Sequence, residues 1–257
     1  MTSTDGELLV RIVDGIAHVT LNRPQARNAL TFGMYEELAK LCALAGTADD
    51  ADHIKAIVIA GAGDKAFAAG TDIGQFTAFG STEDGLRYEA KVEAVISQIE
   101  SCHVPVIAAL HGAVTGGGLV IAAAAHVRIA SAAVVTGNCL AVSNLRRLTA
   151  LFGESRVAHM ILTAELLDAE ALLTSGFVHE VLPDHDGLMA RANQLAERLK
   201  QMAPLTIQAS LEGLRRLRQA APLPDDADLI EKSYVSADFA EGVRAFLEKR
   251  KPQWQGK

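Results

Sequence analysis

Three consecutive glycines, Gly116 to Gly118, begin a run of small apolar residues in the stretch HGAVTGGGLVIAAAAHV. In a turn from strand to helix, the first helical N–H groups have no intrahelical partner, and the helix dipole adds partial positive charge there. Because glycine has no Cβ, a ligand can approach these N–H groups closely. The stretch therefore predicts an oxyanion or phosphate site. The alternative is that the small residues only allow a helix to pack closely on a sheet.

A second glycine turn lies in AFAAGTDI, where Gly70 and Thr71 follow a short apolar run. Two turns of this kind can each offer one N–H group to a single carbonyl oxygen. Preorganised donors have their largest effect where negative charge develops on an oxygen in the transition state. Together the two turns favour a site that polarises a carbonyl group.

The elements that position these turns follow an order of strand, turn and helix. LLVRIV and IAHVTL flank Asp14-Gly15, which predicts a hairpin with a type I′ turn. A helix is expected after Thr31 as N-cap and before Gly46, and another over 86–99. IKAIVIAG indicates a buried parallel strand, and the order of strand, turn and helix repeats at VPVIAAL, HGAVTGGG and LVIAAAA. From Arg146 onward the pattern is mostly helical.

Composition limits the possible functions. The chain has 257 residues, of which 49% are hydrophobic and 21% charged, as expected of one globular domain with a helical extension. A net charge of −7 argues against nucleic acid as the main partner, although it still permits a phosphate-bearing ligand. The longest apolar run, Leu119 to Ala125, is far shorter than the roughly 20 residues of a membrane helix.

Cysteine spacing and the N-terminus indicate the compartment. Cys42, Cys102 and Cys139 form no paired or metal-binding pattern, which favours a reducing environment. No spacing of histidines and carboxylates indicates a metal site. The N-terminal MTSTDGELLV lacks a basic region followed by an apolar run, so we expect no secretory signal and a cytoplasmic protein.

The two glycine turns also carry a family resemblance. IKAIVIAGAGDKAFAAGTDI, followed by VPVIAALHGAVTGGG, resembles the enoyl-CoA hydratase/isomerase family, the crotonase superfamily. LNRPQARNAL near the start and SADFAEGVRAFLEKRKP near the end resemble that family's terminal signatures. The resemblance implies an α/β, crotonase-like spiral of ββα units over 1–195 and a C-terminal helical region over 196–257 used in trimerisation. It also implies a homotrimer or homohexamer that binds acyl-CoA thioesters, with no permanently bound cofactor.

The resemblance assigns site residues position by position. The thioester carbonyl would lie between the backbone N–H groups of Thr71 and Gly117. Seven further positions match those that the family uses along the CoA moiety. The adenine and phosphates would contact the loop of Gln25, Ala26 and Arg27. The pantetheine channel would be bordered by Ala69 and Ile73, and the nucleotide end would also contact Phe246 and Lys249. For the last two, a helix face with a solvated lysine is the alternative interpretation.

The chain departs from the family at its two catalytic glutamates. Val120 occupies the first position, and the second falls on or next to Cys139. Only LAVSNL separates Cys139 from Arg146, several residues fewer than the family's loop. Valine cannot transfer a proton, and a positioned acid or base typically contributes a factor of about 10²–10⁴ in rate. We therefore expect little of the hydration that the family's hydratases catalyse.

Other polar groups have both a catalytic and a structural interpretation. Cys139 would be a nucleophile toward the thioester, yet a free cysteine is usually a small buried hydrophobic residue. Glu89 and Glu93 lie four residues apart on the helix expected to border the acyl pocket, where a solvated helix face is the simpler interpretation. His111 and His126 flank the glycine motif, and we expect structural roles for both.

Three functional hypotheses follow. The leading one is an acyl-CoA enzyme of hydratase or isomerase type that uses the oxyanion hole with a rearranged or absent acid/base set. The second is an acyl-CoA thioester hydrolase that acts through Cys139 or an activated water. The third is a non-catalytic acyl-CoA-binding subunit. Release of free CoA separates the second from the others, and tight binding without turnover favours the third.

Overall fold

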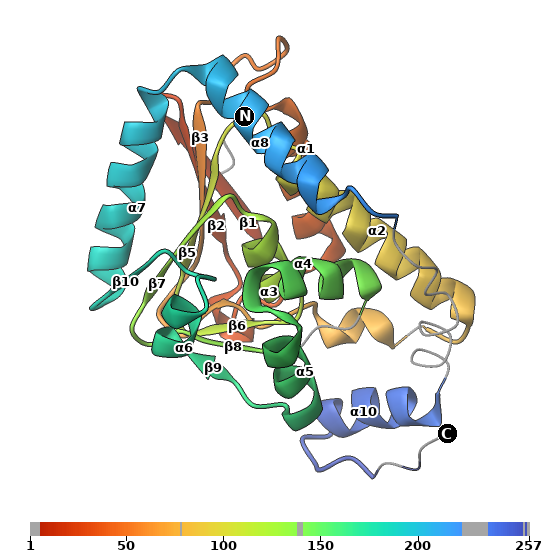
Figure 1. Ribbon diagram of the computed structural model, residues 1–257. Coiled ribbons are helices and arrows are strands. Elements are labelled where there is room, and N and C mark those ends of the chain that lie inside the picture. The colour runs from red at the N-terminus through yellow and green to blue at the C-terminus, as the bar shows by residue number, and fades with distance from the viewer. Residues whose placement is uncertain (1–5, 78, 138–140, 223–235, 254, 256–257) are drawn as a thin grey trace.

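The computed structural model of the chain describes residues 6–77, 79–137, 141–222, 236–253 and 255. Two β-sheets lie at the centre, with helices around them (Figure 1). The larger sheet has the order β1-β2-β3-β5-β7-β10, and its pairings are parallel except that of β1 with β2. Its strands are β1 (Leu8–Val13), β2 (Ile16–Leu21), β3 (Ala56–Gly61), β5 (Val106–Leu110), β7 (Val127–Ser131) and β10 (Glu180–Leu182).

The smaller sheet has the order β4-β6-β8-β9, with strands β4 (Ala66–Ala68), β6 (Ala113–Thr115), β8 (Val135–Gly137) and β9 (Leu167–Asp168). The chain passes repeatedly from the larger sheet to the smaller and then into a helix. β3 and β4 precede α2 (Thr82–Glu100), β5 and β6 precede α3 (Gly117–Ala124), and β7 and β8 precede α4 (Val142–Phe152). This repeat of two strands and a helix is the predicted spiral of ββα units.

The N-terminal hairpin confirms the prediction made from Asp14-Gly15. Both residues have positive φ, 49° and 76°, as a type I′ turn requires. Val13 pairs directly with Ile16 across the turn. The two-residue connection therefore fixes the register of β1 on β2, and β2 in turn pairs in parallel with β3.

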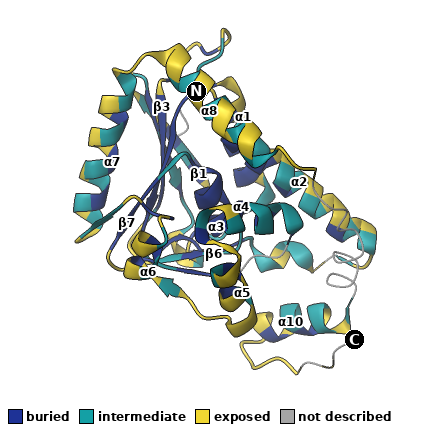
Figure 2. Ribbon diagram, viewed as in Figure 1, coloured by how far each residue is buried: buried dark blue, intermediate teal, exposed yellow. Residues whose placement is uncertain are grey.

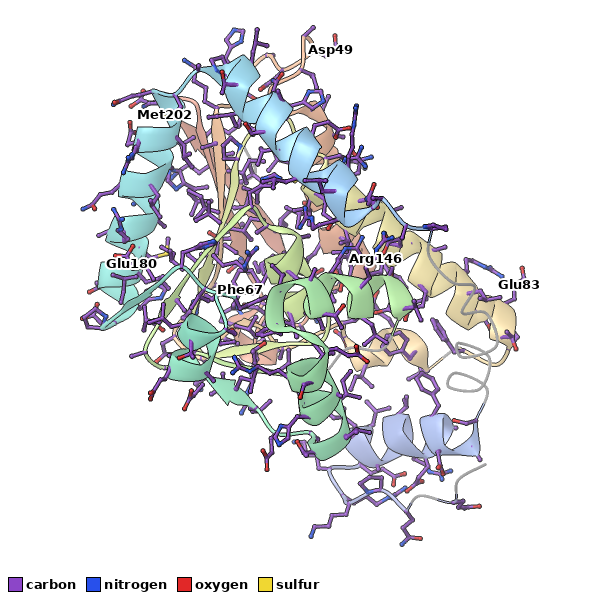
Figure 3. All side chains as sticks on the ribbon, viewed as in Figure 1. Asp49, Phe67, Glu83, Arg146, Glu180 and Met202 are labelled. Carbon is purple, nitrogen blue, oxygen red and sulfur yellow. The ribbon has the colours of Figure 1, made fainter. Side chains whose placement is uncertain are left out.

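Strand β3 is buried along its whole length, as its unbroken apolar sequence predicts (Figure 2). Ile57 and Ile59 face the main core, which is filled by α1 (Phe32–Leu44), α2 and α3. Residues on the other face, including Val58, pack against α7 (His185–Lys200). Phe67 of β4, labelled in Figure 3, is fully buried in the main core. The six-stranded sheet is thus covered by helices on both faces.

Helix starts agree with the caps in the sequence. Thr31 accepts a hydrogen bond from the Met34 N–H at the start of α1, as predicted. Ser81 and Asp84 form a capping box at the start of α2, which begins four residues before the predicted 86. None of the helices in the described ranges is long and apolar enough to cross a membrane.

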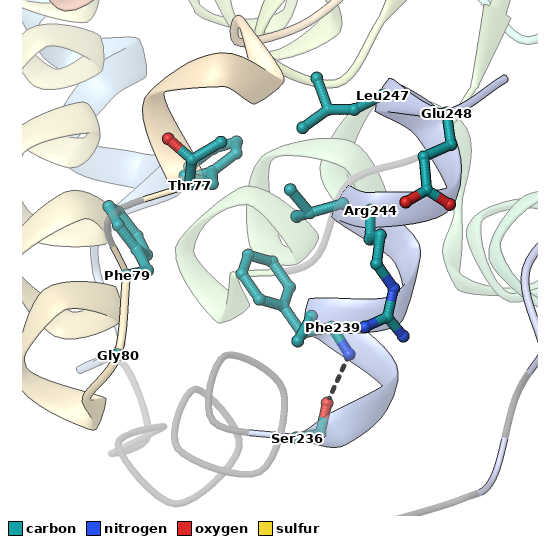
Figure 4. A pocket seen from close by; sticks show the side chains of 11 residues that line it. Thr77, Phe79, Gly80, Ser236, Phe239, Arg244, Leu247 and Glu248 are labelled. Atoms are coloured by element: carbon teal, nitrogen blue, oxygen red, sulfur yellow. Dashed lines mark hydrogen bonds between the residues drawn. The ribbon is translucent and has the colours of Figure 1, made fainter.

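The C-terminal third is mainly helical, as predicted. Residue 195, where the sequence analysis ends the core, lies inside α7, and the division into two regions stays a prediction. α8 (Pro204–Arg218) has no buried residue. α10 (Ala237–Leu247) lies apart from the sheets (Figure 1). Phe239 of α10 packs edge to face on Phe76 of a short 3-10 helix, η2 (Ile73–Phe76), with 6.0 Å between the ring centroids, and both residues line a cavity of about 400 Å³ (Figure 4). The other helices of the described ranges are η1 (Pro24–Ala26), α5 (Glu154–Thr163) and α6 (Ala169–Thr174).

Candidate active site

The two glycine turns meet at one edge of the smaller sheet. β4 and β6 are parallel neighbours, so their carboxyl ends lie side by side, and each is followed by a glycine turn. Gly70 has φ +108° and Gly116 has φ +51°, conformations that favour glycine. A Cβ on Gly70 would lie 3.9 Å from Gly117 N, and one on Gly116 would lie 3.3 Å from Gly70 Cα. The two backbones therefore approach one another to van der Waals contact.

The segment after Gly70 is held by hydrogen bonds to Leu30. The Leu30 N–H donates to Gly70 O at 2.8 Å, and the Asp72 N–H donates to Leu30 O at 2.9 Å. Between them, the Thr71 N–H has no acceptor among the described residues, and neither has the N–H of Gly117, the first residue of α3. The fold thus presents two backbone donors whose acceptor would have to come from outside the described chain.

A chain of three hydroxyl groups borders these donors. Thr71 Oγ1 lies 3.0 Å from Tyr35 Oη and 2.8 Å from Tyr88 Oη, so one side chain from the turn joins α1 to α2. Tyr35 is almost fully buried. Its hydroxyl lies against the Cα of Gly117, where a Cβ would overlap it. Tyr35 therefore contacts both turns and sets the distance between them.

A cavity of about 320 Å³ opens beside the two donors. Helices α2, α3 and α4 supply the walls opposite the turns. Val120, which the resemblance aligns with the first glutamate position, is a buried apolar residue of this wall. The residues that line the cavity are Ala69, Gly70, Thr71, Ile73, Phe76, Tyr88, Glu89, Val92, Thr115, Gly116, Gly117, Val120, Ala141 and Asn144.

The two glutamates of α2 have different environments. Glu89 lines the cavity. Glu93 instead binds Arg147, with 2.7 Å between its Oε2 and Arg147 Nη1. Burial raises the pKa of Glu93, but the hydrogen bonds and charge of Arg147 outweigh burial and lower it overall. Glu93 is therefore a structural ion-pair partner, neither a catalytic group nor the residue of a solvated helix face that the simpler interpretation predicts.

Asp72 also has a structural role. It caps η2 by accepting from the Gly74 N–H at 2.9 Å, and its Oδ2 lies 2.8 Å from Arg23 Nη2. Partial burial raises the pKa of Asp72, and these two hydrogen bonds more than reverse the effect. The carboxylate that follows the turn is thus used to hold the turn in place.

The histidines beside the glycine motif are buried parts of the fold. His126 Nδ1 accepts from the Val106 N–H at 2.9 Å, and burial lowers its pKa to about 4. His111 packs edge to face against His185, and burial with the charge of His185 lowers the pKa of His111 to about 4. Neither His111 nor His126 lines the cavity. The structural interpretation is confirmed for His126, whereas Nδ1 and Nε2 of His111 are buried without a hydrogen-bond partner among the described residues.

The residues expected along the CoA moiety fall into two groups. Ala69 and Ile73 line the cavity. The Ala69 N–H donates to Arg27 O, so the loop of Gln25, Ala26 and Arg27 lies beside Ala69. Gln25 and Arg27 are exposed. Phe246, 63% exposed, and Lys249 lie at the end of α10 and do not line this cavity. Cys139 lies outside the described residues.

Sequence reasoning missed three polar residues of the site. Tyr35 lies on the buried face of α1, three residues before Leu38, so helical spacing marks it as buried but not as a partner of Thr71. Tyr88 directly precedes Glu89 on the helix that borders the cavity, and this position is the one signal that the sequence offers for it. Asn144 lies in the first turn of α4. No sequence pattern indicates that its side chain faces the cavity.

Comparisons with known proteins agree with this architecture. The family model described as enoyl-CoA hydratase/isomerase matches residues 11–257. A probable enoyl-CoA hydratase from Rhodobacter capsulatus is 36% identical over 262 residues, with 96% of each chain covered. The crystal structure of an enoyl-CoA hydratase/carnithine racemase from Magnetospirillum magneticum has 27% identity and a TM-score of 0.77, covering 99% of this chain and 97% of that one.

A further solved structure is that of a methylmalonyl-CoA decarboxylase in complex with 2-nitronate-propionyl-CoA. It has 25% identity and a TM-score of 0.85, covering 98% of this chain and 99% of that one. The similarity in sequence and in fold thus extends over nearly the whole chain. The predicted crotonase-like fold is confirmed, and the chain belongs to the enoyl-CoA hydratase/isomerase family.

Proposed function

We propose that the protein binds an acyl-CoA thioester with its carbonyl oxygen between the N–H groups of Thr71 and Gly117. The observation that carries the proposal is the meeting of the two glycine turns, which leaves these donors without described acceptors beside a cavity. A thioester carbonyl gains negative charge as an enolate forms at its α carbon. Preorganised donors stabilise that charge without reorganising during the reaction.

Chemistry at the α carbon fits this site better than addition of water. Hydration by a glutamate pair needs one carboxylate at the position of Val120 and another near Cys139, and valine lines the cavity instead. Glu89 is the one carboxylate among the described lining residues. The function we propose is therefore enolate formation on an acyl-CoA, as in an isomerase, by an enzyme with a rearranged acid/base set.

Decarboxylation is a second candidate. It is favoured by the TM-score of 0.85 to a methylmalonyl-CoA decarboxylase, against 0.77 for the hydratase/racemase structure. Loss of CO₂ from an acyl-CoA forms the same enolate and needs the two N–H donors but no base. Against it, Glu89 lines the cavity and would repel a carboxylate on the acyl group.

The remaining parts of the proposal concern the CoA moiety and the assembly. The loop of Gln25, Ala26 and Arg27 would contact the nucleotide, and no cofactor beyond the CoA of the substrate is required. Leu205, Leu214 and Leu217 of α8 are 58–76% exposed, a pattern suited to burial between subunits. We therefore propose a homotrimer or homohexamer.

Calorimetry with CoA and short acyl-CoAs tests the proposal. We expect binding at or below millimolar ligand, and its absence would refute the proposal. A product assay then separates the reaction types: isomerised acyl-CoA supports the main proposal and CO₂ the second candidate. Free CoA would indicate the hydrolase, in which case Cys139→Ser tests the nucleophile. Tight binding with no product from any thioester would indicate a non-catalytic subunit.

A further inference from the structure

Two cysteines that are far apart in the sequence lie together in the main core. Cys42 is in the last turn of α1, and Cys102 follows Ser101, the residue that caps the end of α2. Both are free thiols, 2% and 3% exposed, and belong to the same cluster of buried side chains. A side-chain hydrogen bond joins the two thiols. Sequence spacing indicates no cysteine pair, and the fold nevertheless brings these two sulfur atoms into contact.

The segments that follow the two cysteines pack against each other. A Cβ on Gly46 would lie 2.7 Å from Val104 Cγ1 and 3.3 Å from His103 Cβ, so the turn after α1 touches the turn after α2. Asp50 holds the first of these turns, because it accepts from the Gly46 N–H at 2.9 Å and from the Ile54 N–H at 2.7 Å. The contact between the thiols is therefore supported by the packing of the backbone around them.

The two thiols differ in acidity. The Cys42 S–H and the Val104 N–H both donate to Cys102 Sγ, and these hydrogen bonds lower the pKa of Cys102, although burial and the charge of Asp50 oppose them. The hydrogen bond between the thiols, together with burial, raises the pKa of Cys42. Because the thiolate is the form that reacts with oxidants, Cys102 is the attacking sulfur and Cys42 is the resolving thiol.

A cavity of about 510 Å³ lies beside Cys102, between the end of α2 and α8. Cys102 forms part of its wall. Ala209 and Arg216 of α8 also line it and are exposed, so the cavity reaches the surface. Cys42 is not among the described lining residues. A small oxidant can therefore approach Cys102 by this route.

We propose that Cys42 and Cys102 form a redox modification site, at which a hydroperoxide such as hydrogen peroxide converts the two thiols into an intramolecular disulfide. Neither cysteine lines the candidate acyl-CoA cavity as described, so this inference does not depend on the proposed function.

The reaction takes two steps. The Cys102 thiolate attacks one oxygen of hydrogen peroxide and the O–O bond breaks, so that Cys102 becomes a sulfenic acid and the leaving hydroxide takes up the proton that Cys102 lost. Cys42 Sγ then attacks the Cys102 sulfur, the S–O bond breaks, and the hydroxyl leaves with the Cys42 proton as a second water. Two electrons pass from the two sulfur atoms to the peroxide. A thiol reductant reverses the product by exchange.

The disulfide cross-links α1 to the end of α2, the same two helices that Thr71 joins through Tyr35 and Tyr88. The loop that it closes runs from Cys42 to Cys102 and contains the turn at Thr71. A cross-link over a loop of this length restricts the unfolded chain and should raise the melting temperature by about 5–10 °C.

Peptide mapping of the full-length wild-type protein tests the inference. The protein is treated with excess hydrogen peroxide, alkylated under denaturing conditions without reductant, and digested. We expect a linked peptide pair that contains Cys42 and Cys102, lighter by two hydrogen atoms than the two thiol peptides and absent after dithiothreitol. Free thiols at both positions, a sulfinic acid at either without the link, or a link between two chains overturns the proposal. An oxidised form that melts no higher than the reduced form overturns the stabilising effect.

Single variants test the order of the two sulfurs. In Cys42→Ala the sulfenic acid of Cys102 has no thiol to resolve it, so dimedone should label Cys102. In Cys102→Ala the remaining Cys42 should stay unlabelled, and its labelling would overturn the assigned order. Cys139→Ala is the matched control: it keeps both residues and should form the link as wild type does, whereas loss of the link there would overturn direct pairing. The map of the wild-type protein decides the matter where a variant does not fold.

Discussion

The hydroxyl of Tyr35 occupies the space that a Cβ on Gly117 would fill. The same hydroxyl lies 3.0 Å from Thr71 Oγ1, so one buried side chain of α1 touches both glycine turns. The position of the second turn relative to the first is thus set by a residue more than thirty positions before either of them.

This contact predicts the effect of Gly117→Ala. The added methyl group overlaps Tyr35 Oη, and overpacking of this kind costs about 1–3 kcal/mol of unfolding free energy. We expect a lower melting temperature and weaker acyl-CoA binding. Tyr35→Phe removes the overlapped atom, so the double variant should recover much of the lost stability.

Gly213→Ala is the matched control for that pair, because nothing lies within 4 Å of the new methyl group on exposed α8. It should leave stability unchanged or raise it slightly. A Gly117→Ala variant as stable as Gly213→Ala would contradict the packing described around the turn.

Crotonyl-CoA should bind but hydrate slowly. With Val120 in the cavity wall, water has no base at that position, and we expect a turnover well under about 10 s⁻¹, the median for enzymes generally. Val120→Glu alone should not restore hydration, since a glutamate pair acts as a unit and the resemblance gives this chain no carboxylate at the second position either. The rate is measured from the decrease in absorbance as the conjugated double bond of crotonyl-CoA is hydrated. Hundreds of turnovers per second would mean that Glu89 performs the proton transfer.

Stability should fall in mild acid because of buried histidines. The pKa of His126 is about 4 in the folded state and ordinarily 6.5, so the unfolded chain takes up the proton first as the pH falls. The stability contributed by the neutral ring is complete above pH 6.5 and is lost between 6.5 and 4. For one such histidine the loss at pH 5 is about 2 kcal/mol.

Urea unfolding at pH 7.5 and pH 5 measures this loss. His126→Asn keeps an acceptor for the Val106 N–H and removes the titrating ring, so its stability should depend less on pH than that of wild type. The same pH dependence in both proteins would show that the acid sensitivity arises elsewhere.

Light scattering tests the assembly. The exposed leucines of α8 predict a trimer or hexamer at micromolar concentration, and Leu217→Glu, which puts charge on a 75% exposed position, should weaken it. A wild-type monomer would contradict the proposed assembly.

The parts of the fold that the sequence predicts are those determined by residues close together in the chain. Asp14-Gly15 fixes a hairpin, Thr31 caps a helix, and the apolar run of β3 has to be buried, because each depends on neighbouring residues only. The repeat of strand, turn and helix then predicts the spiral. Apolar spacing predicts a start for α2 four residues too late, because the first turn of the helix is polar and is held by its capping box.

The polar side of the site depends on pairs that are distant in the sequence. Arg147 is 54 residues from Glu93, so helical spacing identifies Glu93 but cannot reveal its partner. The sequence indicates a role for Thr71 through its backbone N–H alone, because its hydroxyl contacts with Tyr35 and Tyr88 arise only when α1 and α2 pack together. The same packing brings Asn144 to the cavity.

The most direct test of the central claim compares butyryl-CoA with its thioether analogue, which lacks the carbonyl oxygen and is otherwise matched. If the oxygen lies between the N–H groups of Thr71 and Gly117, calorimetry should give a Kd about tenfold or more lower for the thioester, as two hydrogen bonds imply. Equal Kd values for the two ligands would contradict the claim.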